Sequence, residues 1–462
     1  MQVRPDRVPD QAKQSPVRRS CLTSVPPSWA NWEGEPRVGS WGDSMPEDLF
    51  YEPEDMTVDN RVPVIISMPK GREKELTAMC VDCLGLKKTG EVPLVNGSIF
   101  EVAPDQLHTL RDQLPADARV AINARIHYDN PLKVLPMIGP EENTRGQYSP
   151  TLPGIEKVWE KGFTGKGQTI AIIDSGIYPH ADLKDRVKGW VDLSTEKKKN
   201  MIDPFGHGTH VAGLAAGSGA KSAGKYKGIA PEADLVGVRI TTVVEAIRAL
   251  QWVIENKEKY NIKVVNMSLG DYATKSYKDD PWAQATQKAI EAGLVVVVAA
   301  GNEGPQPSTI STPGTNPEAI TVGAYDDKGT PNNRADDTVA SFSSRGPTAV
   351  DRLSKPDVLA PGVRVFGPLS PNSKLDVPDL PHEGKDYLAM SGTSQATPMA
   401  SGLAALMLQA NPNLTHKDIK EILIASADRN LQDDANTQGA GLLNAEKAVE
   451  LALARKEQPL AA

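Results

Sequence analysis

The sequence predicts an α/β protein with a mostly parallel, twisted sheet and helices on both faces, preceded by a small α+β domain. From about residue 155 onwards, runs of continuous apolar residues alternate with helical patterns. Such runs are typical of parallel strands that are buried on both faces and joined by helices. Residues 62–128 instead mix short strands and helices within a length that suits a separate small domain.

The composition is that of a globular protein. The chain has 462 residues, of which 39% are hydrophobic and 24% are charged, which is enough for one large α/β domain with additional segments. The formal net charge of -8 argues against nucleic acid as the main partner, because phosphate binding needs a basic surface. No apolar run is long enough to span a bilayer, so we expect no membrane partner either.

Four regions follow one another along the chain. Residues 1–60 are rich in Pro, Arg, Asp and Glu with little periodicity, which indicates a disordered or loosely attached leader. Residues 61–130 form the small domain. Residues 131–152 form a linker rich in Pro, Gly and polar residues, of the kind that proteases can reach, and residues 153–455 form the large domain.

The hydrophobic patterns also place the elements of both domains. In the small domain, strands are expected at 62–69, 97–103 and 118–128 and helices at 71–85 and 104–115. In the large domain, strands are expected at 168–174, 233–240, 263–270, 294–302 and 318–325. Helices are expected at 207–217, 243–259, 282–293 and 416–427, and directly after Ser394.

Four unusual polar residues fall near the carboxyl ends of strands or the starts of helices, where α/β folds gather their catalytic groups. Asp174 ends a buried strand in IAIIDSG, and His207 begins a helix in GHGTHVAG. Asn302 ends a strand in AAGNEG, and Ser394 begins a helix in GTSQATP. Taken alone, Ser394 is more typical of an ordinary helix cap than of a nucleophile. Together, Asp, His and Ser match the roles of orienter, general base and nucleophile, and an Asn amide can donate to an oxyanion.

The chain order Asp, His, Ser is that of subtilisin, and the sequence resembles the subtilisin-like serine proteases, or subtilases, over about residues 140 to 450. The motifs IAIIDSGI, GHGTHVAG and GTSQATPMASG carry the resemblance, supported by NMSLG and AAGNEG. The resemblance implies a serine endopeptidase that works through an acyl-enzyme and needs no cofactor for its chemistry. The catalytic residues that it implies are Asp174, His207, Ser394 and Asn302.

Further roles are also implied by the resemblance. The residues that would pair with the substrate and line its primary pocket are Ser268, Leu269, Gly270, Ala299, Ala300 and Gly301. The block 62–128 looks like a subtilase propeptide, an intramolecular chaperone and inhibitor, so the protein would be a self-processing zymogen that is cut within 129–150. The expected partners are protein or peptide substrates and its own propeptide, and the expected state is a monomer.

Three segments depart from the family pattern. Many subtilases carry a glycine-rich loop that clamps the substrate, and in this sequence the corresponding stretch, GVRITTVVEAIRAL, is several residues shorter. The outer substrate subsites therefore cannot be assigned from the resemblance. The loop after the histidine helix, GSGAKSAGKYKG, has lysines and no acidic residue, so a structural calcium ion is not supported at that position. Residues 366–387 form an insertion near the cleft whose role the sequence does not indicate.

Metal binding and cell compartment are weakly constrained. His210 is expected to pack within its helix, and Cys80 and Cys83 are expected to be buried, because a zinc site needs four ligands. We therefore expect no metal-binding residues. The N-terminus has no visible secretory signal and the chain has three cysteines, which favours the cytoplasm or an unrecognised export route.

Two competing hypotheses remain, one from a different functional class and one enzymatic. One is a catalytically silent subtilase fold, blocked by its own N-terminal domain, that serves as a binding module. The other is a processing protease with one or few substrates, which the shortened clamp loop and the insertion leave open.

Overall fold

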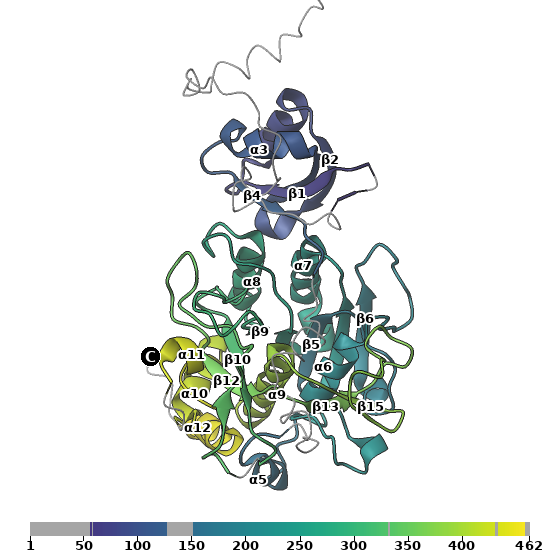
Figure 1. Ribbon diagram of the computed structural model, residues 1–462, viewed down its shortest axis with the longest axis vertical. Coiled ribbons are helices and arrows are strands. Elements are labelled where there is room, and N and C mark those ends of the chain that lie inside the picture. Colours follow the sequence, from purple (N-terminus) through teal and green to yellow (C-terminus); the bar gives the residue numbers. More distant parts are fainter. Residues whose placement is uncertain (1–55, 58, 127–150, 331–332, 430–432, 458–462) are drawn as a thin grey trace, which may run out of the picture. The chain divides into compact units, whose positions relative to one another are not determined.

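The computed structural model describes residues 56–57, 59–126, 151–330, 333–429 and 433–457 (Figure 1). The chain divides into two compact units, Met1–Ile122 and Asn123–Ala462, called here the N-terminal and the C-terminal unit. Residues 1–55 of the expected leader and residues 131–150 of the expected linker lie outside the described residues.

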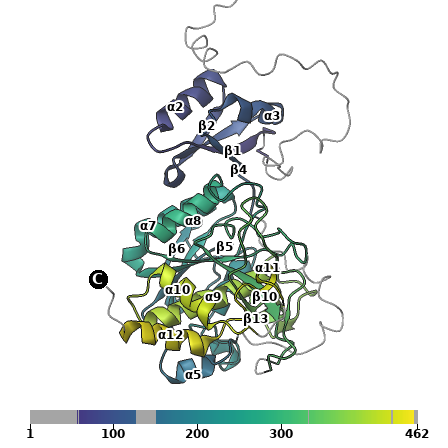
Figure 2. The same cartoon turned by 90° about the vertical axis from the view of Figure 1, so that its left-hand side faces the viewer.

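The N-terminal unit is an antiparallel four-stranded sheet with two helices on one face (Figure 2). The strands lie in the order β2-β3-β1-β4 and are β1 (Val62–Ser67), β2 (Lys87–Val92), β3 (Gly97–Val102) and β4 (Arg119–Ile122). The helices are α2 (Glu73–Ala78), which continues into a π-helical turn at Met79–Cys83, and α3 (Pro104–Gln113). The unit thus has the α+β character that the sequence predicts.

The two cysteines of the π-helical turn differ in burial. Cys80 is fully buried, and burial raises the pKa of its thiol to about 12, so it is a neutral apolar side chain at any physiological pH. Cys83 is only partly buried. The expectation that both cysteines are buried therefore holds for Cys80 and is wrong for Cys83.

The C-terminal unit is built on an eight-stranded sheet in which β10–β11 is the single antiparallel pair among the described strands. The strand order is β11-β10-β9-β8-β5-β7-β6, with β12 paired to β10. The strands are β5 (Thr169–Asp174), β6 (Val187–Asp192), β7 (Asp234–Arg239), β8 (Ile262–Met267), β9 (Val295–Ala299), β10 (Ile320–Asp326), β11 (Thr338–Val339) and β12 (Val358–Pro361). The predicted mostly parallel α/β fold is confirmed.

Helices cover this sheet on both faces. On one side, α7 (Val243–Tyr260) and α8 (Pro281–Glu291) pack against each other, and α9 (Thr393–Ala410) lies on the other (Figure 2). Helix α6 (His207–Ala216), labelled in Figure 1, packs against α9. The remaining helices are α5 (Ile155–Glu160), α10 (His416–Ser426), α11 (Ala435–Gln438) and α12 (Ala445–Glu457). Among the described residues, no helix combines the length and the apolar character needed to cross a membrane.

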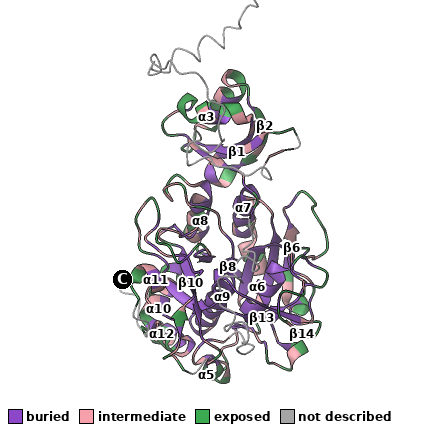
Figure 3. Ribbon diagram, viewed as in Figure 1, coloured by how far each residue is buried: buried purple, intermediate pink, exposed green. Residues whose placement is uncertain are grey.

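Helix α9 forms the centre of the core. All of its residues except Gln409 are buried, and it packs against β8, β9 and β10 as well as against α6 and α12 (Figure 3). Because its first turn carries Ser394, the position of that residue is fixed by a rigid helix rather than by a loop.

The expected insertion at 366–387 folds as an excursion within a small antiparallel sheet. This sheet has the order β13-β15-β14, with β13 at Val365–Pro368, β14 at His382–Glu383 and β15 at Tyr387–Met390. A separate apolar cluster holds it together and comprises Leu369, Leu375, Leu380, Leu388 and Met390. Phe205, two residues before His207, packs on the same cluster, so the insertion contacts the loop that leads to the histidine.

Candidate active site

Asp174 and His207 face each other at the end of β5. Asp174 is the last residue of that strand and His207 the first residue of α6, and both are fully buried. Asp174 Oδ1 lies 2.8 Å from His207 Nδ1. A carboxylate at Nδ1 favours the tautomer with its proton on Nδ1, which makes Nε2 the basic nitrogen of the ring.

Ser394 is held beside the end of the neighbouring strand, β8. Its Oγ donates to the carbonyl oxygen of Ser268 at 2.9 Å, and Ser268 Oγ donates to the carbonyl oxygen of Ser394 at 2.9 Å. Ser268 directly follows β8, which pairs in parallel with β5. The carboxyl ends of these two adjacent strands therefore carry the serine on one side and the Asp174–His207 pair on the other.

Asn302 presents a buried amide donor next to Ser394. Its Oδ1 accepts from Thr393 N at 2.8 Å and from Thr393 Oγ1 at 3.0 Å. Its Nδ2 is buried and has no acceptor among the described residues. A Cβ atom added to Gly392 would lie 3.1 Å from this Nδ2 and 3.6 Å from Ser394 N. Two N–H donors on one side of Gly392 can stabilise an oxyanion formed by attack of Ser394.

The two segments expected to bind substrate come together around Ser311. A Cβ atom on Gly301 would lie 2.2 Å from Ser311 Oγ, and one on Gly270 would lie 2.8 Å from Ser311 Cβ. Ser311 N also donates to the carbonyl oxygen of Ala300 at 2.9 Å. Leu269, Ala299 and Ala300 are buried in both backbone and side chain.

A pairing edge lies at the start of α7, in the segment that the sequence shows to be shortened. Residues 123–126 pair with it in antiparallel fashion, with Arg125 opposite Thr242. Ile126 N donates to the Thr241 carbonyl at 2.9 Å and Val243 N donates to the Ala124 carbonyl at 3.0 Å. The side chains of Ala124 and Ile126 are buried, whereas Arg125 is exposed. This edge can therefore bind an extended chain although the loop is shorter than in many subtilases.

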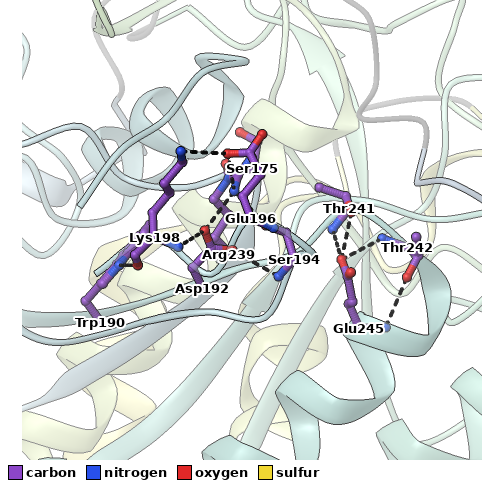
Figure 4. Close-up of polar contacts among 10 residues, drawn as sticks. All are labelled: Ser175, Trp190, Asp192, Ser194, Glu196, Lys198, Arg239, Thr241, Thr242 and Glu245. Atoms are coloured by element: carbon purple, nitrogen blue, oxygen red, sulfur yellow. Dashed lines mark hydrogen bonds and ion pairs between the residues drawn. The ribbon is translucent and has the colours of Figure 1, made fainter. Parts of the chain in front are cut away.

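A capping box keeps this edge rigid. Thr242 Oγ1 accepts from Glu245 N, and Glu245 Oε2 accepts from the backbone amides of Thr241 and Thr242 (Figure 4). Burial raises the pKa of the Glu245 carboxyl group.

His210 has a packing role, as the sequence predicts. Its ring is buried one turn after His207, and its Nε2 hydrogen-bonds to the carbonyl oxygens of Val365 at 3.1 Å and Leu388 at 3.2 Å. Burial, followed by the nearby His207, lowers the pKa of His210 to about 3. His210 is thus a neutral donor that ties α6 to β13 and β15.

The loop after α6 contributes no carboxylate that could bind calcium. A buried carboxylate beside this loop, that of Asp182, accepts from Lys221 N at 3.0 Å and from the Tyr387 hydroxyl at 2.6 Å. Both carboxylate oxygens are therefore engaged, and the loop itself contributes lysines instead of acidic ligands. Elsewhere in the described part of the chain, no group of three or more His, Cys, Asp or Glu side chains is arranged to hold a metal ion.

Two further side chains near the pair escaped the sequence analysis. Ser175 directly follows Asp174, and its backbone N–H donates to Asp174 Oδ1 at 2.7 Å. Asp203 is buried four residues before His207 and accepts from backbone amides at the start of α6. An Asp shortly before a helix is a known N-terminal signal, which is the one trace of this role in the sequence.

Comparisons with known proteins agree with the fold and with these motifs. Residues 165–441 match the model of the subtilase family. The chain is 39% identical to the serine protease AprX of Bacillus subtilis (strain 168) over 84% of this chain and 88% of that protein. It is 33% identical to subtilisin E of the same organism over 67% of this chain and 74% of the relative.

Solved structures support the same fold. Fervidolysin from Fervidobacterium pennivorans, a keratinolytic enzyme related to subtilisin, superposes with a TM-score of 0.62 at 22% identity. The match covers 84% of this chain and 61% of fervidolysin. Sphericase superposes with a TM-score of 0.53 at 27% identity, over 65% of this chain and 99% of its own.

The chain is a serine-type endopeptidase. It belongs to the subtilase family, as its motifs predict. Its substrates are accordingly proteins or peptides, and subtilase catalysis requires no cofactor.

Proposed function

We propose that Asp174, His207 and Ser394 act as a catalytic triad that hydrolyses peptide bonds. His207 Nε2 takes the proton of Ser394 Oγ as the oxygen bonds to the peptide carbonyl carbon. The C–N bond then breaks, and His207 returns this proton to the leaving amine. Water hydrolyses the acyl-enzyme by the same steps in reverse order. Asp174 holds the imidazole in the required tautomer.

The observation that carries this proposal is the pair of donors beside Ser394. Asn302 Nδ2 is buried without an acceptor among the described residues, and buried donors are nearly always paired in native proteins. An oxyanion formed during peptide hydrolysis would supply the missing acceptor. A catalytically silent binding module has no need for such a group, so this amide favours the enzyme over that alternative.

Substrates are proposed to bind as an added strand. Residues 123–126 lie at the α7 edge with alternate side chains buried, which is how an extended peptide is recognised by β-augmentation. The walls around Ser311, formed by 268–270 and 299–301, then receive the side chain before the cut bond. Small or branched apolar residues at the positions of Ala124 and Ile126 suit this edge.

The same segment supports a zymogen. We propose that residues 61–130 act as an intramolecular inhibitor and that the enzyme cuts its own chain within 129–150, a stretch outside the described residues. Residues 123–126 end two residues before this stretch and bind the edge proposed for substrates. We further propose that the mature enzyme is a monomer.

The test compares Ser394→Ala with the wild type. Wild-type protein is expected to react with a fluorophosphonate at Ser394 and to shorten on incubation, as measured by mass spectrometry. Ser394→Ala should remain full length and unlabelled, because it has lost the nucleophile. Ser401→Ala is the matched control, since Ser401 is buried in the same helix and bonds to Asn266 Oδ1; it should keep both labelling and shortening. Peptide cleavage by Ser394→Ala at the wild-type rate would refute the triad.

A further inference from the structure

Asp203 and Ser175 connect the two elements that carry Asp174 and His207. We propose that these two side chains are positioning residues, which hold the Asp174 carboxylate and the His207 imidazole at their working separation. The inference rests on the proposed roles of Asp174 and His207. It assigns no chemistry to Asp203 or Ser175, because neither is proposed to contact the substrate.

Asp203 is a buried carboxylate with every visible contact directed at the base of the site. Asp203 is only 3% exposed to solvent. Oδ1 accepts from Ser175 Oγ at 2.8 Å and from Gly206 N at 2.8 Å. Oδ2 accepts from Thr209 N at 2.8 Å and from Thr209 Oγ1 at 2.7 Å. A carboxylate that binds free amides at a helix N-terminus is favourable, and here the helix begins with His207.

Ser175 links that carboxylate to the Asp174 side. Its backbone N–H donates to Asp174 Oδ1, the same oxygen that faces His207 Nδ1. Its Oγ accepts from Gly208 N at 2.9 Å and donates to Asp203. One residue thus fixes the orientation of the Asp174 carboxylate and the backbone next to His207.

The close approach of β5 and α6 leaves no room for these contacts to vary. A Cβ atom on Gly208 would lie 2.2 Å from the carbonyl oxygen of Gly176 and 3.0 Å from Asp174 Cβ. Only glycine fits at position 208, because the start of α6 lies in direct contact with the end of β5. Small movements of α6 would therefore translate directly into the separation of Asp174 and His207.

A buried arginine, Arg239, binds the backbone carbonyl of Ser175, whose side chain contacts Asp203. Arg239 Nε donates to the Ser175 carbonyl at 3.2 Å (Figure 4). Arg239 Nη1 is in turn held by Asp192 Oδ2 at 2.8 Å and Ser194 Oγ at 2.7 Å. Since Arg239 ends β7, which pairs with β5, this network fixes the backbone of Ser175 within the sheet.

The 366–387 insertion covers the remaining side. Ser370 Oγ donates to the Asp203 carbonyl at 2.8 Å, and Leu375 N donates to the Phe205 carbonyl at 3.1 Å. Ser373 lies directly over Gly206, where a Cβ atom would be 2.4 Å from its Oγ. The insertion thereby encloses the loop before His207, which gives this segment a structural role that the sequence did not indicate.

The test uses the active enzyme, produced from the full-length chain, with three variants. Asp203→Asn replaces an acceptor with an amide nitrogen, so at least one of the four donors loses its partner. Ser175→Ala removes the link while keeping a small side chain. Asp280→Asn is the matched control, because Asp280 caps α8 by accepting from Trp282 N at 2.7 Å and Ala283 N at 3.1 Å.

We expect kcat to fall about 10- to 100-fold in Asp203→Asn and Ser175→Ala with KM nearly unchanged, because small displacements of catalytic groups have effects of this size. The acid limb of kcat/KM should move to lower pH in Asp203→Asn, since a negative charge at the start of α6 has been removed. The neighbouring charged groups that remain are Asp174 and, behind Ser175, Arg239 paired with Asp192, while His210 is neutral. Asp280→Asn should leave kcat and the pH profile unchanged, because its Oδ1 can still accept from both amides.

The outcomes separate this inference from the proposed function. Wild-type kcat in both site variants, with an unshifted acid limb in Asp203→Asn, would overturn the positioning role, while fluorophosphonate labelling of Ser394 would still support the triad. If Asp203→Asn does not fold, Ser175→Ala decides by its kcat. Absence of labelling and cleavage in the wild type would instead refute the proposed function itself.

Discussion

At the scale of single residues, the amide of Asn302 links structure to chemistry most directly. Its Oδ1 is engaged by Thr393, whereas its Nδ2 is buried without an acceptor among the described residues. Leaving a buried donor unpaired costs about 1–3 kcal/mol. Retaining such a group is understandable if the acceptor forms only during the reaction, because the interaction then stabilises the transition state selectively.

Asn302→Asp tests this reasoning with an almost isosteric change. The variant keeps an oxygen for Thr393 and loses the N–H donor. We expect kcat to fall about 10²- to 10³-fold, the range known for an oxyanion amide of subtilisin, a member of the same family. KM should change little, because the donor acts on the transition state. Steady-state kinetics with a peptide substrate provide the measurement.

Asn316→Asp serves as its control. Asn316 is also buried, but its Nδ2 donates to the Ala283 carbonyl at 3.0 Å and is thus structurally satisfied. This variant should be less stable and should keep its kcat. A kcat of Asn302→Asp equal to that of Asn316→Asp would contradict the oxyanion role.

The sequence predicts residues with a chemical role better than residues that hold them. Asp174, His207, Asn302 and Ser394 stand in motifs whose residue types already indicate proton transfer and nucleophilic attack. Asp203 offers no comparable signal, because its importance arises from four donors that converge only in the folded chain.

At the scale of elements, the edge before α7 is the feature with the clearest functional consequence. Val243 is the first residue of α7, and its N–H donates to the Ala124 carbonyl at 3.0 Å. Proline is tolerated at a first helical position, where the N–H has no partner within the helix. Thr242 already has the extended backbone, φ -135° and ψ 163°, that a following proline requires.

Val243→Pro is therefore expected to remove one backbone hydrogen bond to the substrate and leave the helix intact. A hydrogen bond of this kind contributes about 0.5–1.5 kcal/mol, so kcat/KM should fall about 2- to 12-fold, mainly through KM. The measurement is kinetics with a peptide long enough to reach the edge. A short ester substrate that cannot reach it should be cleaved at the wild-type rate.

Ala435→Pro is the matched control for this change. Ala435 is the exposed first residue of α11, and the preceding Asp434 is also extended, with φ -79° and ψ 168°. This variant should keep its KM for both substrates. An unchanged KM in Val243→Pro for the long peptide would show that substrates do not pair with this edge.

Strand position explains which elements the sequence could predict. The central strands β5 and β9 are continuous apolar runs, TIAIID and VVVVA, with every residue buried. The edge strands β2 and β6, KKTGEV and VKGWVD, are only partly buried and lack an apolar pattern. Edge strands can expose polar side chains on either face. Hydrophobic patterns therefore predicted the central strands β5 and β9 but not the edge strands β2 and β6.

At the scale of the whole molecule, a buried cluster of charges couples stability to pH. Lys355 is fully buried, and its Nζ donates to Asp357 Oδ2 at 2.7 Å and to the Ala319 carbonyl at 2.8 Å. Lys420 Nζ lies 3.0 Å from Asp357 Oδ1 and also donates to the Ala319 carbonyl. Two ammonium groups thus share one carboxylate in the interior, so Asp357 retains a partner when Lys355 is replaced.

Burial lowers the pKa of Lys355 to about 7 from its ordinary value of 10.5. Between these two values the unfolded chain binds more protons than the folded chain, so the free energy of unfolding rises as the pH increases from about 7 towards 10. Lys355→Met removes this titrating group and should abolish its part of the slope. The measurement is urea unfolding at pH 7 and 9.5 of the Ser394→Ala protein, which should not cut itself. The free energies of unfolding are compared with and without Lys355→Met. The stability of Ser394→Ala should rise with pH relative to that of the double variant, and parallel pH profiles would show that Lys355 keeps an ordinary proton affinity in the folded chain.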